Sequence, residues 1–239
     1  MTNLKKLASS QPGLRLNILR RVGQIASFLV VTALLLFIAA GSLTWLYAWL
    51  YMGVSLLIIL INSFFATPEL AELVAERGRK KENVEKWDPL LSGLILLPWL
   101  GIYLVAGLDF RWQWFPELVV GWHLGALIMY VLGNYLALWA MTANRFFSTA
   151  VRIQFDRGQT VCSGGPYRYI RHPGYLGMII YILASPIILG SLWAMIPAII
   201  TMILFMVRTW LEDITLRQKL PGYREYANRV RYRLIPGLW

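Results

Sequence analysis

Six apolar runs constrain this chain more than any other feature of its sequence. A helix needs about 20 apolar residues to cross the roughly 30 Å hydrocarbon core of a membrane. Hydrophobic residues make up 58% of the chain and charged residues only 15%, unlike the composition of a soluble domain. The sequence therefore predicts an all-α fold, a polytopic transmembrane helical bundle of about six spans. The expected spans lie near 22–41, 44–66, 89–108, 118–141 and 192–211, with a shorter one at 174–190.

The domain organisation follows from the absence of any linker or recognisable repeat between these runs. We expect one membrane domain over residues 1–239, in which 1–141 holds the N-terminal transmembrane helices and their connectors. Residues 142–239 are different, because their polar parts are rich in Arg, Tyr and Gly. These parts flank a tight hairpin of two short spans with Gly190 and Ser191 at its tip. Polar residues at a membrane boundary beyond those needed for anchoring usually serve a site, so we look for function here.

The charge of the chain is one-sided. The net charge is +11, and with six spans 22 of the 23 Lys and Arg residues fall on one side of the membrane, which leaves Arg111 opposite. By the positive-inside rule that side is cytoplasmic, so both termini and the candidate site are expected to face the cytoplasm. Anionic membrane lipids are the expected counter-charge, and no nucleic acid or obligate protein partner is expected. A bacterial inner membrane and an endomembrane both fit.

Cysteine and histidine are scarce. Cys162 is the only cysteine, which excludes an intramolecular disulfide and a cysteine-based metal cage. The two histidines, His123 and His172, have no cluster of carboxylates near them, so we predict no metal. His123 lies midway in a span, where a histidine is more often a hydrogen-bonded packing residue than a catalyst, and we assign it no role.

The charged segment 67–88 separates the second and third runs. Leu70, Leu73 and Val74 are spaced as on one face of a helix, with charges between them. This pattern predicts a cytosolic or interfacial helix, most simply a solvated connector between spans.

The stretch "GGPYRYIRHPGYLG", residues 164–177, carries more polar residues than an anchor needs. Gly164, Gly165 and Pro166 predict a turn. The tyrosines and arginines that follow are also typical of an interfacial belt. However, Pro173 suits the first turn of a helix, which puts His172 at or near the N-cap. Free backbone N–H groups would then converge there and could receive a carboxylate or phosphate.

Two charged pairs stand near the end of the last span. Arg208 and Glu212 are four residues apart, as are Asp213 and Arg217, so each pair shares a helix face. They could be two weak surface ion pairs. Ionisable groups at the end of a span that face the bundle are instead a functional hypothesis, and a cation and an anion one turn apart could hold two differently charged ligands.

The stretch "GPYRYIRHPGY", followed by Arg208, Glu212 and Asp213 and then by "GYREYANRVRYRLIP", resembles the isoprenylcysteine carboxyl methyltransferase and phospholipid methyltransferase family of integral membrane enzymes. The resemblance covers about residues 140–236. It implies a methyltransferase that moves a methyl group from S-adenosylmethionine to a lipidic or hydrophobic acceptor, possibly an isoprenylcysteine carboxylate. Residues 142–239 would then be the catalytic region that binds the cofactor.

The resemblance also implies roles for individual residues. Arg208 falls on the position associated with the methyl acceptor, and Glu212 is implied both in catalysis and in cofactor binding. The other expected cofactor-binding residues are Gln154, Gln159, Thr160, Val161, Cys162, Tyr167, His172, Pro173, Gly174 and Tyr175.

Two other interpretations stay open at the level of the sequence. Membrane sterol reductases that use NADPH resemble the same C-terminal pattern, although no clear dinucleotide-phosphate pocket is visible. A non-catalytic membrane scaffold is the third, but it would not need Arg208 and Glu212 beside His172. Under the methyltransferase interpretation, the identity of the methyl acceptor stays open.

Overall fold

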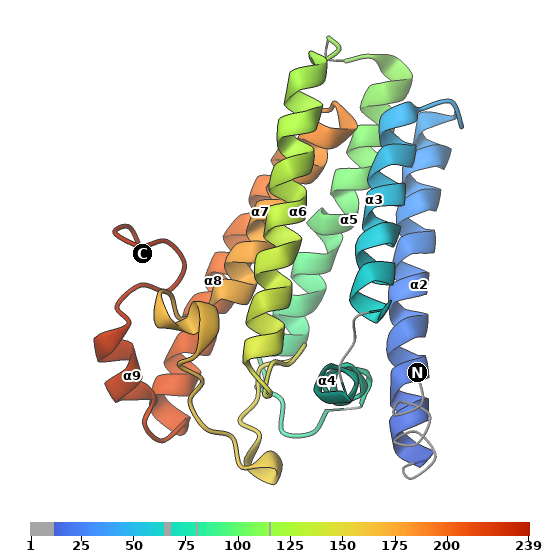
Figure 1. Ribbon diagram of the computed structural model, residues 1–239. Helices are drawn as coiled ribbons and strands as arrows, with labels where there is room; N and C mark the ends of the chain where they lie inside the picture. Colours follow the sequence, from blue (N-terminus) through green and yellow to red (C-terminus); the bar gives the residue numbers. More distant parts are fainter. Residues whose placement is uncertain (1–11, 65–67, 80, 115) are drawn as a thin grey trace.

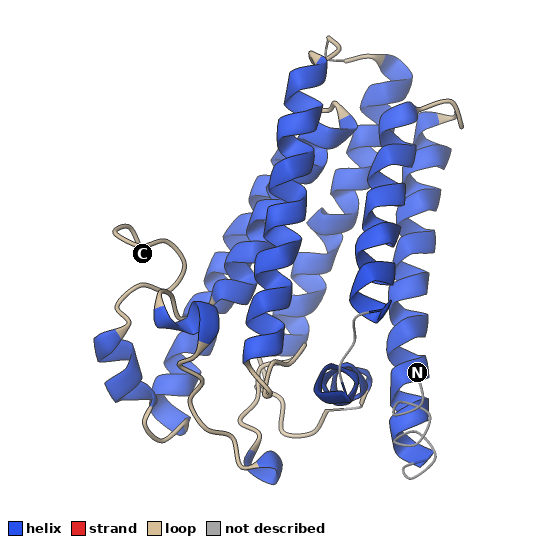
Figure 2. Ribbon diagram, viewed as in Figure 1, coloured by secondary structure: helices blue, strands red, loops and turns tan. Residues whose placement is uncertain are grey.

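The structure is a computed structural model that describes residues 12–64, 68–79, 81–114 and 116–239. Within these ranges it is a bundle of helices without β-strands, which confirms the predicted all-α class (Figures 1 and 2). The α-helices are α2 (Pro12–Ala40), α3 (Leu46–Phe64), α4 (Pro68–Gly78), α5 (Asp88–Trp112), α6 (Val120–Ala143), α7 (Pro173–Leu189), α8 (Met195–Lys219) and α9 (Tyr223–Arg229). Two 3-10 turns, η1 (Phe155–Arg157) and η2 (Gly165–Arg168), lie between α6 and α7.

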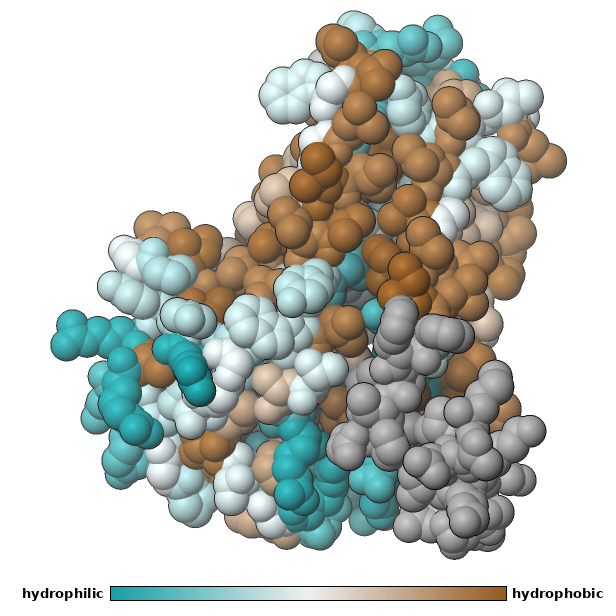
Figure 3. All heavy atoms as spheres, viewed as in Figure 1, coloured by the Kyte–Doolittle hydropathy of each residue, from teal (hydrophilic) through white to brown (hydrophobic). Residues whose placement is uncertain are grey.

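Five of these helices are long and apolar enough to cross a membrane, namely α2, α3, α5, α6 and α8. The sixth predicted span forms α7, whose 17 residues rise about 25 Å at 1.5 Å per residue. The polytopic helical bundle is thus confirmed. Figure 3 shows a brown apolar surface along the bundle and teal polar residues gathered at the end that carries α9. Which membrane face this end occupies stays a prediction.

The helices extend beyond the apolar runs at the polar end of the bundle. α2 begins at Pro12, ten residues before its apolar run, and α8 continues to Lys219. The two ends lie on the same side of the bundle, together with α4 and α9 (Figure 1). The predicted connector in 67–88 does contain a helix, α4, although residues 65–67 and 80 lie outside the described ranges.

Two glycines allow close packing of α6 against α7, the helices that position the site. A Cβ on Gly133 of α6 would lie 2.8 Å from the carbonyl oxygen of Gly177, and one on Gly177 of α7 would lie 2.6 Å from that of Gly133. Only residues without a side chain allow this approach, which is typical of helix packing in membranes. α7 then turns into α8 through Gly190, whose φ of +78° requires glycine, so the predicted hairpin tip is confirmed.

Buried polar groups in the apolar part of the bundle pair with one another. The hydroxyls of Tyr51 and Tyr103 are 2.9 Å apart, and Ser55 Oγ lies 2.8 Å from the hydroxyl of Tyr130. His123 Nδ1 lies 2.9 Å from the carbonyl oxygen of Ile188, and its ring stacks on Tyr47. These contacts agree with the interpretation of His123 as a packing residue.

Candidate active site

A cavity of about 350 Å³ opens at the polar end of the bundle, between the 144–162 loop, the start of α7 and the end of α8. Eleven of the twelve residues proposed from the sequence line it. From the loop come Gln154, Gln159, Thr160, Val161 and Cys162, and from η2, α7 and α8 come Tyr167, His172, Gly174, Tyr175, Arg208 and Glu212. Pro173 is buried in the first turn of α7 but does not line the cavity. The structure therefore gathers the candidate residues, while their roles stay predictions.

Arg208 is held by a partner that lies 120 positions away in the sequence. Its Nη2 donates to Asp88 Oδ1 at 2.7 Å and to the carbonyl oxygen of Thr149 at 3.0 Å. Asp88 sits in the first turn of α5, and its second carboxylate oxygen accepts the backbone N–H of Val151 at 3.1 Å. This ion pair fixes Arg208 against both α5 and the loop. The Nε of Arg208 is buried and has no hydrogen-bond partner in the described part of the chain, so this donor is unsatisfied.

Glu212 lies one turn along α8 and has a different partner. The hydroxyl of Tyr175 donates to its Oε2 at 2.5 Å. The guanidinium carbon of Arg208 lies 5.8 Å from the centre of the Tyr175 ring, so the tyrosine stands between the two charged residues. The alternative of an intrahelical surface ion pair between Arg208 and Glu212 is wrong, because each residue bonds elsewhere and both line the cavity.

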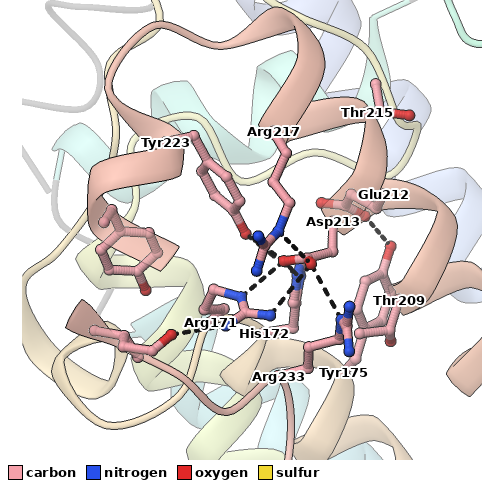
Figure 4. A network of polar contacts seen from close by, with 12 residues as sticks. Arg171, His172, Tyr175, Thr209, Glu212, Asp213, Thr215, Arg217, Tyr223 and Arg233 are labelled. Atoms are coloured by element: carbon pink, nitrogen blue, oxygen red, sulfur yellow. Dashed lines mark hydrogen bonds and ion pairs between the residues drawn. The ribbon is translucent and has the colours of Figure 1, made fainter. Parts of the chain in front are cut away.

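Asp213 points away from the cavity into a second cluster, shown in Figure 4. A residue that follows Glu212 directly is rotated by about 100° around a helix of 3.6 residues per turn. Asp213 is fully buried and accepts a bidentate pair from Arg171, with Nε and Nη2 at 2.7 and 3.2 Å. We call this group the Asp213 cluster; its members are Arg171, His172, Asp213, Arg217, Tyr223 and Arg233.

The Asp213 cluster ties the C-terminal segment to the helices. Arg217 and Arg233 each place Nε 3.1 Å from Asp213 Oδ2, and the hydroxyl of Tyr223 donates to Oδ1 at 3.0 Å. Burial, and next the negative charge of Asp213, raises the pKa of the Tyr223 phenol, which keeps it protonated as a donor. The predicted pair of Asp213 and Arg217 is confirmed, but it is part of a buried network and not a weak surface ion pair.

The start of α7 matches the prediction for His172. This residue is the N-cap and Pro173 follows as the first helical residue. The His172 ring lies in the Asp213 cluster, with Nε2 3.4 Å from Asp213 Oδ1 and 3.4 Å from the hydroxyl of Tyr223. Its own backbone N–H donates to the carbonyl oxygen of Arg233 at 2.9 Å. His172 therefore both lines the cavity and positions the start of α7.

Gly174 has a packing explanation. A Cβ at this position would lie 2.6 Å from the ring of Phe147, so the absence of a side chain lets the loop close against α7. This packing contact explains the glycine at position 174, and no contact with a ligand is needed to explain it.

Two glutamines organise the 144–162 loop. The backbone N–H of Gln154 donates to Gln159 Oε1 at 2.7 Å, and the side chain of Gln154 donates to the carbonyl oxygen of Phe146 at 2.6 Å. Arg157 Nη1 donates to the side-chain oxygen of Gln154, Oε1, at 2.7 Å. Cys162 donates its thiol to the carbonyl oxygen of Ala143 at 3.3 Å, and burial raises the pKa of that thiol. The loop is thus shaped from within, and Thr160 and Val161 line the cavity between these anchors.

The interfacial-belt interpretation of 167–171 is right for only part of that segment. Arg168 and Tyr169 are exposed, whereas Tyr167 and Arg171 are buried. The ring of Tyr167 lines the cavity, and its carbonyl oxygen accepts the hydroxyl of Tyr226 at 2.8 Å. Burial raises the pKa of the Tyr167 phenol, which therefore stays neutral.

The fold and this cavity define a class of protein: a polytopic helical membrane protein with a polar cavity set into one end of its bundle. Several arginines, the Glu212 carboxylate and several tyrosines line that cavity beside apolar side chains, so it can hold a charged molecule next to an apolar one.

Comparison with known sequences shows which proteins the chain is similar to. Residues 126–218 are similar to the profile described as the Isoprenylcysteine carboxyl methyltransferase (ICMT) family. A rice protein (Oryza sativa subsp. indica) named "Probable protein-S-isoprenylcysteine O-methyltransferase" is 31% identical over 121 residues, 48% of this chain and 63% of its own length. "Protein-S-isoprenylcysteine O-methyltransferase B" of Arabidopsis thaliana is 29% identical over 174 residues, 70% of this chain and 85% of its own length.

Proposed function

We propose that this chain is a membrane enzyme that transfers a methyl group from S-adenosylmethionine to the carboxylate of an isoprenylcysteine or a similar hydrophobic acceptor. The family match spans α7 and most of α8, which carry Tyr175, Arg208 and Glu212. The observation that carries the proposal is that Arg208 and Glu212 line one cavity one helical turn apart, each with its own partner. This arrangement can receive two ligands of different charge side by side.

The residues of the cavity fit S-adenosylmethionine. The cavity volume of about 350 Å³ lies within the range of small-molecule pockets, roughly 300–1,000 Å³. When bound, this cofactor supplies a methyl group attached to a positively charged sulfur atom. The rings of Tyr167 and Tyr175 can face such a cation, because aromatic faces attract positive charge. The Glu212 carboxylate can accept hydrogen bonds from an amino or hydroxyl group.

The start of α7 can serve a carboxylate of the cofactor. Pro173 has no N–H, and the first backbone N–H groups of a helix have no intrahelical partners. These groups and the positive end of the helix favour an anion. The Asp213 cluster fixes this end by holding Arg171 and His172 immediately before it.

Arg208 would orient the acceptor. The pair with Asp88 uses Nη2 and leaves Nε without a hydrogen-bond partner, so the guanidinium keeps donor capacity for an acceptor carboxylate while its position is fixed. An ionised carboxylate is already a nucleophile, so this chemistry needs no general base. Alignment of the two reactants and the exclusion of water then supply most of the rate enhancement. An ammonium acceptor would first have to lose a proton to a base.

The test is methyl transfer by the purified protein in detergent, with methyl-labelled S-adenosylmethionine and a prenylated cysteine that has a free carboxylate. We expect label in an ester that mild base hydrolyses. The matched control is the same prenylated cysteine with its carboxyl group amidated, which should take no label. Equal labelling of both compounds would contradict a carboxylate acceptor, and binding of neither cofactor nor acceptor would contradict the proposal as a whole.

A further inference from the structure

Two arginines outside the Asp213 cluster line the cavity close enough for the charge of one to act on the other. Arg21 of α2 and Arg77 of α4 both line the cavity, together with Trp99, Met178 and Tyr181. Neither arginine has a role in the proposed methyl transfer. The geometry points to a binding site for a phosphate group carried on a lipid, with Arg21 and Arg77 as its cationic ligands. This inference concerns a binding step and does not depend on the proposed methyl transfer.

The close crossing of α2 and α4 forces the two cations together. Gly78 ends α4 against α2, where a Cβ would lie 2.1 Å from the carbonyl oxygen of Asn17 and 3.2 Å from the Cβ of Arg21. Any side chain at residue 78 would push the helices apart. Glycine at this position therefore holds Arg77, the residue before it, beside Arg21. Like charges held at such a crossing repel each other unless an anion joins them.

Among the side chains that the structure describes, no carboxylate forms an ion pair with either arginine. Arg77 donates Nη1 to the sulfur of Met141 at 2.9 Å and lies 5.2 Å from the centre of the Phe147 ring, while its buried Nε has no hydrogen-bond partner in the described part of the chain. Arg21 donates to Gln24 at 3.1 Å. The nearest acid in sequence, Glu76, pairs with Arg152 at 3.1 Å and with Arg79 at 3.9 Å.

The electrostatics of Arg77 agree with this geometry. Burial, and next the positive charge of Arg21, lowers the pKa of the Arg77 guanidinium to about 10, so the group stays charged at neutral pH without a counter-ion. A bound anion would favour the charged form of Arg77 and raise this pKa.

Phosphate on a lipid is the ligand that matches the site. A phosphate monoester carries up to two negative charges, and its oxygens suit the planar fork of a guanidinium. Two guanidinium groups therefore balance one phosphate. The side chains of Trp99, Met178 and Tyr181 extend the same cavity along the apolar helices α5 and α7, which gives acyl chains an apolar wall.

The test is calorimetric titration of the purified protein, in non-ionic detergent, with a short-chain phosphatidate. Two further probes are phosphatidylcholine with the same chains and inorganic phosphate. We expect phosphatidate to bind at least about tenfold more tightly than either probe. Arg21→Ala and Arg77→Ala should each weaken phosphatidate at least about tenfold, equivalent to about 1.4 kcal/mol.

Matched controls come from the neighbouring arginines. Arg20 and Arg79 are exposed, lie outside the cavity and carry the same charge, so Arg20→Ala and Arg79→Ala should leave phosphatidate affinity within about twofold. Equal weakening by all four variants would show general attraction to a basic surface and overturn the site. If inorganic phosphate bound as tightly as phosphatidate, the inference that the phosphate is carried on a lipid would be overturned.

A thermal measurement guards against misfolded variants. Without lipid, Arg21→Ala and Arg77→Ala should unfold at or above the wild-type temperature, because each removes a repulsion. Phosphatidate should raise the unfolding temperature of the wild-type protein and of Arg79→Ala but not that of Arg77→Ala. An equal rise in all three proteins would contradict the site.

Discussion

Glu212 and Asp213 are adjacent acids on α8, yet they belong to different regions of the molecule. Asp213 is enclosed by three arginines, a histidine and a tyrosine. Glu212 faces the cavity and has a single described side-chain partner, Tyr175. A carboxylate whose bonding capacity is filled by its own chain has a structural role, whereas one that keeps capacity toward a cavity can accept a ligand. By this difference, Asp213 stabilises the structure around the site, whereas Glu212 is available to bind a ligand.

The largest expected effect is on the Asp213 cluster. Asp213→Asn would remove the charge that Arg171, itself almost fully buried, requires. Breaking a buried ion pair costs about 3–5 kcal/mol. We therefore expect a much lower unfolding temperature or loss of folded protein, measured by thermal unfolding in detergent. Asp156→Asn is the matched control, because that carboxylate is half exposed and should change stability little. Equal unfolding temperatures for the two variants would remove the structural role of Asp213.

Glu212→Gln should leave the fold intact and change binding. The variant loses the carboxylate charge in the cavity, so affinity for S-adenosylhomocysteine should fall at least about tenfold, or about 1.4 kcal/mol. Equilibrium dialysis with labelled ligand measures this change. Glu225→Gln on the exposed part of α9 is the control and should bind as the wild-type protein does. If Glu212→Gln lost stability as Asp213→Asn does, the contrast between the two acids would be lost.

Arg208→Lys should separate the acceptor from the cofactor. The lysine keeps the charge but loses the planar fork that can bind Asp88 and a carboxylate together. We expect kcat/KM for the acceptor to fall about tenfold or more, with little change in affinity for S-adenosylhomocysteine. Asp88→Asn should weaken the reaction in the same direction, because it loosens Arg208. Parallel losses of cofactor affinity and activity in Arg208→Lys would contradict this division.

The smallest effect is expected at the edge of the Asp213 cluster. Arg217 pairs with Asp213 but is 37% exposed, so solvent screens the interaction. Exposed pairs contribute about 0–1 kcal/mol. Arg217→Ala should therefore lower stability by at most about 1 kcal/mol in thermal unfolding. A loss as large as that of Asp213→Asn would show that the cluster is less redundant than its geometry implies.

The sequence predicted those features that leave local patterns. Spans follow from long apolar runs, the N-cap at His172 from the following proline, and the shared face of Arg208 and Glu212 from their spacing. Asp88 and Arg171 were not predicted as partners of the site. The ion pair of Arg208 joins residues 120 positions apart, and that of Arg171 joins residues 42 apart. Such pairs depend on helix packing, and no local spacing indicates them. The close contact of Gly78, which sets Arg77 beside Arg21, also depends on helix packing and could not be predicted from a local pattern.

The central claim is that the cavity around Arg208 and Glu212 receives S-adenosylmethionine. Calorimetry of the purified protein with S-adenosylhomocysteine and, separately, with NADPH tests this claim most directly. We predict saturable binding of S-adenosylhomocysteine at one site per chain and no heat from NADPH beyond dilution. Saturable binding of NADPH without binding of S-adenosylhomocysteine would contradict the account and favour a reductase.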